Sequence, residues 1–371
     1  MNFGFTEEQE ELRKMVKRFL EEKSPETEVR RLMASEEGYD PAVWNQMANE
    51  LGLQGLGIPE AYGGQGFGPV ELYVVFEEMG AALLCSPYFS TVALGANAVL
   101  FVGNDDDKAA YLPGIASGET IATVALTDDA GQWDLRTTST SAMQSGDGWT
   151  LSGVRSYVTD GNVATLLLIP AQTSGGLSLF AVAGDAPGVA REALATMDQT
   201  RKQSRIVFDG APALLVGVEG AALEGLQATV QVAVAALAAE QVGGAQRVLN
   251  NAVEYAKTRV QFGRPIGSFQ AIKHKCADML LDVESAKSAA YYAAWAAQER
   301  NDELPIASSL AKSFCSEAYF HCAAENIQIH GGIGFTWEHH AHLYFKRAKS
   351  SELLLGDPAY HRELLAQLLG I

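Results

Sequence analysis

The run from Gly225 to Gln246 constrains the fold more than any other stretch of the chain. It is made of Ala, Val, Gln, Gly, Leu and Thr, and its one charged residue is Glu240. Such a run favours a helix that is buried on most of its surface. A single carboxylate inside it is costly to bury unless a cation pairs with it or it has a chemical role. The run therefore predicts a core helix in which Glu240 needs an explanation.

Long helical patterns fill the C-terminal part of the chain. We expect helices over 224–258, 267–300, 305–329 and 359–369. Four helices of this length in series are typical of a bundle. Residues 222–371 are therefore predicted to form a C-terminal four-helix bundle domain.

Residues 1–117 are also predicted to be helical, and they form an N-terminal helical domain. Thr6 precedes a turn rich in acidic residues, which is the pattern of an N-cap at the start of a helix. Apolar residues then recur at helical spacing, at Phe5, Leu12, Val16 and Leu20.

Residues 118–221 have a different pattern. Short β-rich runs such as ATLLLIPAQ and LSLFAVAG are separated by clusters of Gly, Asp and Pro. This pattern indicates a small antiparallel barrel or sandwich, because a βαβ array would place helices between the strands. The predicted fold class is therefore α+β, with a helical domain, a middle antiparallel β-domain and a helical bundle in that order.

Charge and cysteine content limit the partners and the setting. The chain has 371 residues, a net charge of −18 and a pI near 4.8, which argue against nucleic acid or an anionic membrane as the main partner. The four cysteines do not form a disulfide framework, and neither a signal core nor an apolar run of bilayer length is evident. We expect a cytoplasmic protein that does not insert into a membrane.

Three features that resemble binding motifs have simpler interpretations. The segment YGGQGFG does not fit GxGxxG and lies between helices, so it is interpreted as a tight loop. No cysteine or acid cluster accompanies His339, His340 and His342, and we expect no metal site. Cys315 and Cys322 lie two turns apart on a helix and are interpreted as small buried residues.

Two later segments are richer in potential binding groups. RVQFGRPIGSFQ turns between two predicted helices, and its first residue, Arg259, is a planar donor suited to phosphate. The paired glycines of QIHGGIGF let backbone N–H groups approach an anion or a ring closely. Each segment by itself suggests a ligand site without identifying the ligand.

Together with TEEQEELR, IPEAYGGQG, ALTDD and SYVTDG, these segments resemble the acyl-CoA dehydrogenase family in order and spacing over nearly the whole chain. The resemblance implies FAD between the middle domain and the bundle, and a self or homologous subunit, arranged as a dimer of dimers, that completes the site. It implies α,β-dehydrogenation of an acyl-CoA, in which a carboxylate takes the α-proton and flavin N5 takes the β-hydride. The electron acceptor it implies is an electron-transferring flavoprotein.

The resemblance also assigns candidate FAD contacts residue by residue. Leu126 and Thr127 match contacts to the flavin pyrimidine. Tyr157 stands where an aromatic residue packs near the flavin ring, and Thr159 matches a hydrogen bond near N5. Arg259 matches the residue that reaches the pyrophosphate of the partner subunit's FAD. Adenine-side contacts are matched by Phe262, Gln270, Gln328, Gly331 and Gly332.

The catalytic base departs from the family pattern. Many members carry it as a Glu before a Gly on the C-terminal arm, where this chain has Leu355 and Gly356. Other members carry it on the first bundle helix, at the position of Ala233. Glu240 lies on the same face of that helix, about 10 Å further along. The small residues around it leave space for an acyl chain, or equally for a neighbouring helix whose Arg or Lys pairs with the carboxylate.

These departures leave three hypotheses open. In the first, the chain is an FAD-dependent acyl-CoA dehydrogenase with Glu240 as its base, because a site of this class favours a perturbed acid. Asp357 is a weaker candidate for the base, because the sequence GDP is typical of a turn. In the second, it is an FAD-binding or non-catalytic subunit of a heteromeric acyl-CoA dehydrogenase, and the partner chain supplies the acid. The third and least favoured is a flavin oxidase or monooxygenase on the same fold.

Overall fold

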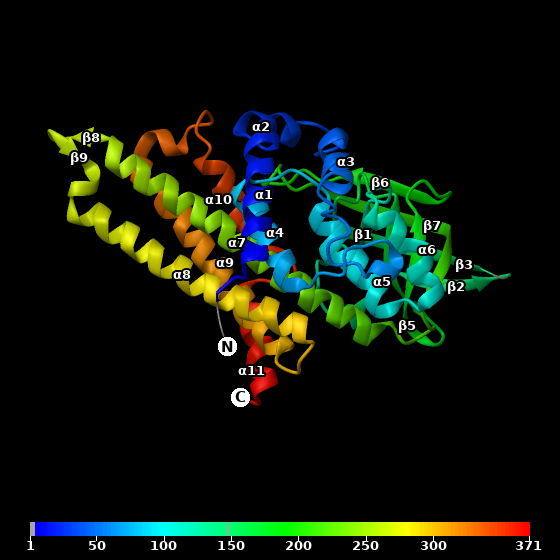
Figure 1. The fold of residues 1–371 in the computed structure, drawn as a ribbon. Coiled ribbons are helices and arrows are strands. Elements are labelled where there is room, and N and C mark those ends of the chain that lie inside the picture. Colours follow the sequence, from blue (N-terminus) through cyan, green and yellow to red (C-terminus); the bar gives the residue numbers. More distant parts are fainter. Residues whose placement is uncertain (1–3, 147) are drawn as a thin grey trace. The chain divides into compact units, whose positions relative to one another are not determined.

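The computed structural model describes residues 4–146 and 148–371, and its contacts divide the chain into two compact units (Figure 1). The first, here called the helical unit, consists of Met1–Arg30, Pro69–Leu84 and Val234–Ile371. The second, here called the barrel unit, consists of Arg31–Gly68 and Cys85–Ala233. The predicted fold class is confirmed, because a β-rich region separates helical regions along the chain.

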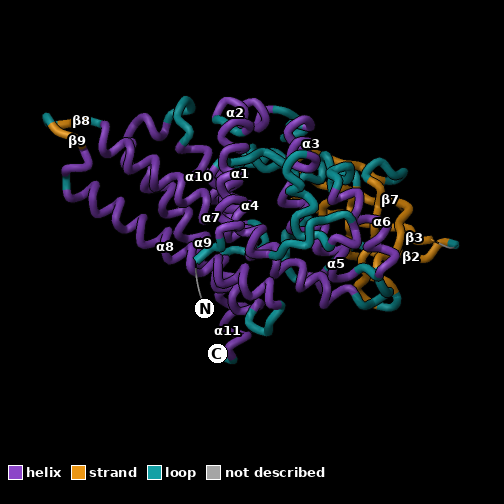
Figure 2. The backbone as a smooth tube through the Cα atoms, in the orientation of Figure 1, coloured by secondary structure: helices purple, strands orange, loops and turns teal. Residues whose placement is uncertain are grey.

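The C-terminal helices, purple in Figure 2, follow the predicted ranges closely. The sequence pattern does not predict a further helix, α10 (Ala341–Leu353). Helices α8, α10 and α11 all pack on α9. The predicted helices are α7 (Ala222–Thr258), α8 (Gln270–Glu299), α9 (Leu304–His330) and α11 (Pro358–Leu369).

Helix α1 (Glu7–Lys23) starts where the sequence predicts. The Thr6 hydroxyl accepts a hydrogen bond from the Gln9 backbone N–H, and the Thr6 N–H donates to the Gln9 side chain. This reciprocal pair satisfies two N–H groups that the first turn of a helix leaves without partners.

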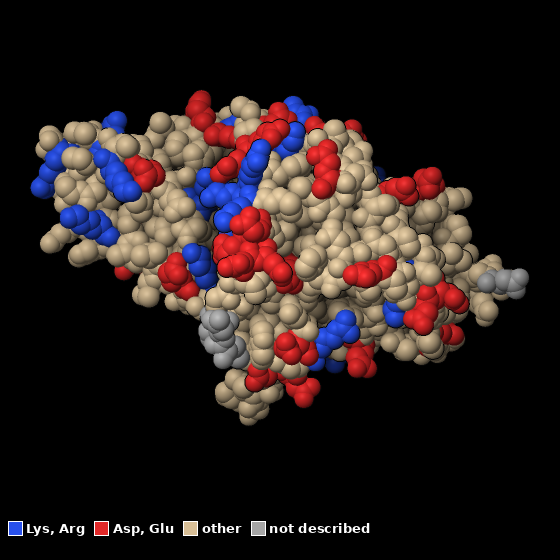
Figure 3. Space-filling model, viewed as in Figure 1, with Lys and Arg blue, Asp and Glu red and all other residues tan. Residues whose placement is uncertain are grey.

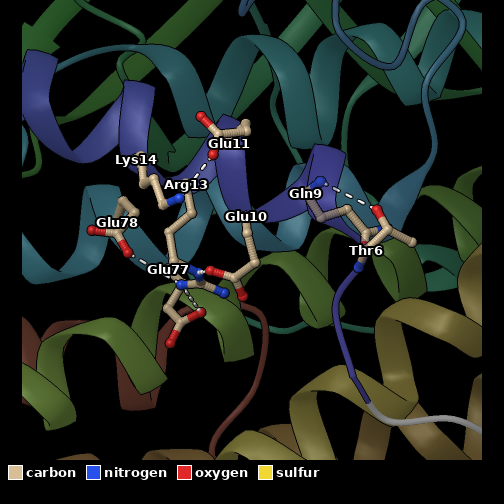
Figure 4. Close-up of polar contacts among 8 residues, drawn as sticks. All are labelled: Thr6, Gln9, Glu10, Glu11, Arg13, Lys14, Glu77 and Glu78. Atoms are coloured by element: carbon tan, nitrogen blue, oxygen red, sulfur yellow. Dashed lines mark hydrogen bonds and ion pairs between the residues drawn. The ribbon is translucent and has the colours of Figure 1, made fainter.

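Helix α1 packs against α4 (Pro69–Ala81) within the helical unit. Figure 4 shows the main polar contact between them: Arg13 reaches Glu77 at 2.6 Å and Glu78 at 3.1 Å. Burial and the two carboxylates act in opposite directions on Arg13, and the net effect raises its pKa. Arg13 therefore joins the two helices as a charged, doubly paired guanidinium.

The barrel unit is built on one seven-stranded sheet. The strands follow the order β1-β4-β2-β3-β7-β5, β6 pairs with β7, and a β4–β5 pairing closes the path. Most pairs are antiparallel as predicted, but β4 runs parallel to β1 and β2. The strands are β1 (Ala122–Val124), β2 (Ser141–Ser145), β3 (Gly148–Thr159), β4 (Leu166–Thr173), β5 (Gly176–Ala183), β6 (Val189–Ala193) and β7 (Gln203–Val216).

Several N-terminal helices belong to the barrel unit, so the predicted helical range 1–117 contributes to both units. In α3 (Pro41–Asn49), the indole N–H of Trp44 donates to the carbonyl of Gly118 at 2.8 Å and ties this helix to the loop that leads into β1. Helix α2 (Glu26–Ala34) crosses from one unit to the other. The other helices of the barrel unit are α3 (Pro41–Asn49), the π-helix η2 (Phe89–Ala96), α5 (Asn97–Val102) and α6 (Asp105–Ala116).

Within the described residues, α7 is long and apolar enough to cross a bilayer, although the sequence interpretation expects no run of that length. Its most apolar window is 56% buried inside the fold. Burial of that kind is what a core helix requires, as the nearly uncharged run predicts.

Candidate active site

The residues predicted to contact the flavin ring lie on β3 and on the segment directly after β1 that pairs with it. Thr127 and Ser156 are joined by two hydrogen bonds: the Thr127 hydroxyl donates to the Ser156 carbonyl at 2.6 Å, and the Ser156 N–H donates to the Thr127 carbonyl at 3.0 Å. Leu126 and Thr127 are buried, and Thr159 is buried on the same strand as Ser156. The structure therefore brings Leu126 and Thr127 next to β3.

Tyr157 is presented by an irregularity in β3. The β3–β7 register shifts between Arg155 and Val158, and Tyr157 adopts a φ of 57°, which is uncommon for a bulky residue. Its side chain is 46% exposed, whereas its neighbours Ser156 and Val158 are buried. A bulge that turns one aromatic ring out of a sheet provides a flat surface on which a ring system can pack.

A short hairpin after α7 carries the next candidates in the helical unit. It consists of β8 (Val260–Gln261) and β9 (Arg264–Pro265). Phe262, at its tip, has a φ of 54° and is 91% exposed. Phe262 also contacts the ring of Phe269, the residue before Gln270, with centroids 6.1 Å apart. The hairpin thus brings Phe262 close to the start of α8.

Arg259 precedes this hairpin and is exposed. Among residues 4–146 and 148–371, no side chain forms an ion pair or hydrogen bond with its guanidinium. A guanidinium without a partner on an acidic protein fits a phosphate ligand.

The segment around Arg259 is strongly basic, a signal that sequence reasoning missed. Between residues 255 and 277 the chain has five Lys and Arg residues and no Asp or Glu, although the whole protein carries −18. Figure 3 shows blue side chains over β8, β9 and the adjacent ends of the helices. Lys257 pairs with Glu254 and Lys275 with Glu325, so the positive charge that favours a phosphorylated ligand comes mainly from Arg259, Arg264 and Lys273. The five residues are Lys257, Arg259, Arg264, Lys273 and Lys275.

The remaining adenine-side candidates lie where α9 ends. Gln328 is exposed in its last turn, and the 3-10 turn η5 (Gly331–Phe335), here called the glycine turn, follows. Gly331 has a φ of 65°, and a Cβ added at Gly331 or Gly332 would meet no atom within 4 Å. Open backbone of this kind fits the close approach of a nucleotide, so the candidates here are compatible with FAD.

Glu240 has a partner in the bundle. It is 5% exposed on α7, and its Oε1 accepts a hydrogen bond from Arg347 Nη1 of α10 at 2.9 Å. Arg347 is also buried. The observed arrangement matches the second option that the sequence leaves open, a neighbouring helix whose cation pairs with the carboxylate.

The small residues beside Glu240 accommodate neighbouring elements. A Cβ at Gly80 of α4 would overlap the Glu240 carbonyl, and a Cβ at Gly243 would overlap the Glu77 carbonyl. A Cβ at Gly244 would overlap the ring of Tyr319 on α9. The glycines therefore serve close helix packing, which favours the ion-pair interpretation of Glu240; its assignment as the base stays a prediction.

The C-terminal arm holds Leu355 in an unusual conformation. Leu355 is 1% exposed and has a φ of 60°, which costs a non-glycine residue about 1–2 kcal/mol. Its carbonyl accepts a hydrogen bond at 2.9 Å from Nε2 of the buried His361. The Asp357 side chain caps α11 by accepting from the Tyr360 N–H, as expected for a turn. The surrounding groups fix the arm although it carries no acid at Leu355.

His361 gives the arm a predictable response to acid. Burial lowers the pKa of His361 from 6.5 to about 4, so the unfolded chain binds a proton more readily than the folded chain. The contribution of His361 to the free energy of unfolding is therefore fully present above pH 6.5. It is lost as the pH falls from 6.5 through 4, by roughly 3 kcal/mol in total. We expect His361→Gln, which keeps an N–H donor, to flatten this part of the pH dependence of the unfolding free energy, measured in urea. Equal slopes for both proteins would contradict the assignment.

The three histidines after the glycine turn are engaged in ring stacking. Trp337 stacks on His342 with centroids 4.8 Å apart, and His339 stacks on His340 at 4.6 Å. Among the residues that the structure describes, no group of three or more His, Cys, Asp or Glu side chains is arranged to hold a metal ion.

Comparison with known proteins identifies the family of the chain. Domain models of the acyl-CoA dehydrogenase family match nearly the whole chain: the N-terminal domain over residues 6–119, the middle domain over 123–211 and the C-terminal domain over 224–370. The acyl-CoA dehydrogenase IpdE2 of Mycobacterium tuberculosis is 36% identical over 362 residues, which cover 98% of this chain and 96% of that protein.

Two similar solved structures each carry a pair of protein names. The ChsE4-ChsE5 complex of Mycobacterium tuberculosis is 30% identical, with a TM-score of 0.90 over 100% of this chain and 99% of that chain. A variant of the Tcur3481-Tcur3483 steroid ACAD is 32% identical, with a TM-score of 0.90 over 98% of each chain.

Proposed function

The chain belongs to the acyl-CoA dehydrogenase family, and from this membership we propose that it acts as one subunit of a flavin-dependent enzyme in which a neighbouring subunit supplies the catalytic base. The enzyme is an oxidoreductase that acts on CH–CH groups, as its family implies. Its reaction introduces an α,β double bond into an acyl-CoA. This chain would then contribute cofactor-binding residues, and the neighbouring subunit would contribute the catalytic base.

The single observation that carries the proposal is that none of the three positions considered for the base, all within the described residues, presents a carboxylate outside an ion pair. The family resemblance assigns the base to the positions of Leu355 and Ala233, and neither side chain can take a proton. Glu240 is buried against Arg347, with α4 packed beside it. A base must reach the α-proton of the substrate, whereas a carboxylate directed at a guanidinium inside a bundle serves the fold.

The FAD candidates support a role in binding a cofactor that is shared between subunits. Arg259 and Phe262 are exposed, as is the glycine turn apart from Gly334, and Tyr255 at the start of the basic segment stacks on His330 directly before that turn. The exposed residues would hold the adenosine and pyrophosphate half of FAD, with Gln270 and Gln328. Leu126, Thr127, Tyr157 and Thr159 of the barrel unit would contact the ring of a flavin. When bound, the flavin supplies the acceptor for the two electrons of the dehydrogenation.

The partners follow from the same comparison. A homologous subunit that carries the acid is the proposed partner, because one similar structure is named as the ChsE4-ChsE5 complex. An electron-transferring flavoprotein is the proposed electron acceptor, and the cytoplasm is the proposed location. Acyl-CoAs that carry a steroid ring system are the first substrates to test, because one similar structure is a steroid ACAD.

One experiment separates this proposal from a self-sufficient enzyme that uses Glu240. The full chain is purified alone, its flavin absorbance is recorded, and acyl-CoAs of different sizes are added without oxygen. We expect no bleaching of flavin by the lone chain, and bleaching when a homologous subunit with the acid is present. Bleaching by the lone chain that Glu240→Gln abolishes in a folded protein would establish Glu240 as the base and refute the proposal.

Arg259→Ala should weaken FAD binding without changing the fold. A hydrogen bond between charged groups contributes about 1.5–3 kcal/mol, so we expect FAD to dissociate at roughly 10- to 100-fold higher concentration. The measurement is a fluorescence titration of FAD into the assembled protein. Lys14→Ala, which removes an exposed pair with Glu11 on α1, is the control and should leave the affinity unchanged. Equal FAD affinity of Arg259→Ala and the native protein would contradict the assignment.

A further inference from the structure

A row of aromatic rings in contact closes the glycine turn, with two stacked pairs joined by a tilted one. Tyr255 of α7 stacks on His330 with centroids 4.2 Å apart, and His330 lies 4.5 Å from His339. His339 then stacks on His340 at 4.6 Å. His330 is the last residue of α9 and His339 follows the glycine turn, so the contact between their rings joins the two ends of the loop.

The far end of the row is anchored to two other helices. His340 Nδ1 lies 3.3 Å from the carboxylate of Glu26 at the start of α2, and its Nε2 lies 2.9 Å from the Asn251 amide of α7. The edge of His340 also faces Tyr344, at 6.0 Å between centroids. A carboxylate on one nitrogen and an amide on the other fix the orientation of this ring.

The inner rings have fixed orientations as well. His330 Nδ1 donates to the carbonyl of Asn326 at 2.8 Å. His339 Nδ1 accepts from the backbone N–H of Ala341 at 3.1 Å. Each ring therefore has one defined tautomer. Gly334, inside the turn, packs on His330 so closely that an added Cβ would lie 2.9 Å from the His330 Cβ.

Close stacking of imidazoles requires that they are uncharged. Burial, with the neighbouring His340 and His330, lowers the pKa of His339 to about 4. Burial also lowers the pKa of His330 and His340, although Glu26 acts in the opposite direction on His340. The three rings are neutral near pH 7 and can remain in contact.

The turn that these rings enclose needs a restraint. It contains three glycines, two of them with no atom within 4 Å of an added Cβ, and glycine loses more conformational freedom on ordering than any other residue. A flexible turn would have to be ordered when a ligand binds, which weakens binding. Contacts that order it beforehand remove that loss.

We propose that the rings of Tyr255, His330, His339 and His340 are positioning residues that hold the glycine turn in the shape needed to bind the adenosine diphosphate half of FAD. The identity of the ligand rests on the proposed function. The restraint on the turn is a property of this chain by itself, so the two can be tested separately.

Hydrogen exchange on the full chain without FAD tests the restraint. His330→Ala removes the central ring, and we expect amide exchange in Gly331–Phe335 to become about tenfold faster, since two ring contacts are lost. His330→Phe keeps a ring of similar size and should restore slow exchange. His321→Ala, which removes a half-exposed histidine of the same helix, is the control and should leave the turn unchanged. Unchanged exchange in His330→Ala would overturn the proposal.

A titration with FAD tests the link to the cofactor. In the assembled protein we expect His330→Ala to need about tenfold more FAD for half-saturation, and His330→Phe to match the native protein. Equal affinity of the Ala and Phe variants would overturn the positioning role. If FAD binds the native protein without slowing exchange in the glycine turn, the proposed cofactor site fails instead, whatever the exchange rates of the variants without FAD.

Discussion

Replacing Arg347 by Met should destabilise the protein by about 3–5 kcal/mol, the usual cost of removing one partner from a buried ion pair. The change takes away the guanidinium that lies 2.9 Å from the Glu240 carboxylate, while Met keeps much of the side-chain volume. The carboxylate stays buried between helices where water cannot replace the lost cation. Urea unfolding at pH 7 measures the difference.

Two further variants show whether this loss belongs to the pair. Combining Arg347→Met with Glu240→Leu removes both charges and should recover most of the stability, because apolar replacements of buried pairs are often neutral. Arg362→Met breaks an exposed pair with Glu317 and should cost less than about 1 kcal/mol. If Arg347→Met costs no more than Arg362→Met, the pair does not stabilise the bundle, and Glu240 becomes a stronger candidate for the base.

Gly243→Ala should be the second most disruptive change. The added Cβ would overlap the backbone carbonyl of Glu77, which no side-chain rotation can relieve, so α4 must move away from α7. We expect a loss of about 3 kcal/mol or more, at the upper end for overpacked cores. Alanine favours a helix over glycine by about 1 kcal/mol, so any net loss reports the packing.

Gly148→Ala provides the matched control for this substitution. The nearest atom to a Cβ at Gly148 is 3.9 Å away, and the expected change is within about 0.5 kcal/mol. Thermal unfolding of the two variants in parallel gives the comparison. A Gly243→Ala protein as stable as Gly148→Ala would mean that α4 and α7 are not closely packed at this point.

The sequence predicts the elements whose signals are local. The start of α1 follows from Thr6 and the acidic first turn, and α7 follows from a nearly uncharged run. Short β-rich runs between turn residues predict the β-region. Parallel pairing of β4 is not predicted, because it depends on strands that are distant along the chain.

In the candidate site, too, the sequence predicts local motifs but not contacts between distant residues. The glycine turn and the Arg259 segment can be recognised because their motifs are continuous, and the basic charge of residues 255–277 could have been counted. The partner of Glu240 could not be found, since Arg347 is 107 residues away on a helix that no periodic pattern predicts. The stacked rings also combine residues from separate helices, so only the folded chain brings them together.

The division into units has a consequence for cutting the chain. Each unit is assembled from separate segments, and the chain passes from one to the other at residues 30–31, 68–69, 84–85 and 233–234. A fragment that ends after the first 117 residues would contain α1 and α4 without α7, whose Gly243 receives α4. A cut between residues 233 and 234 would leave every segment of the barrel unit in one piece, but it would separate α1 and α4 from the rest of the helical unit, so no single cut yields both units intact.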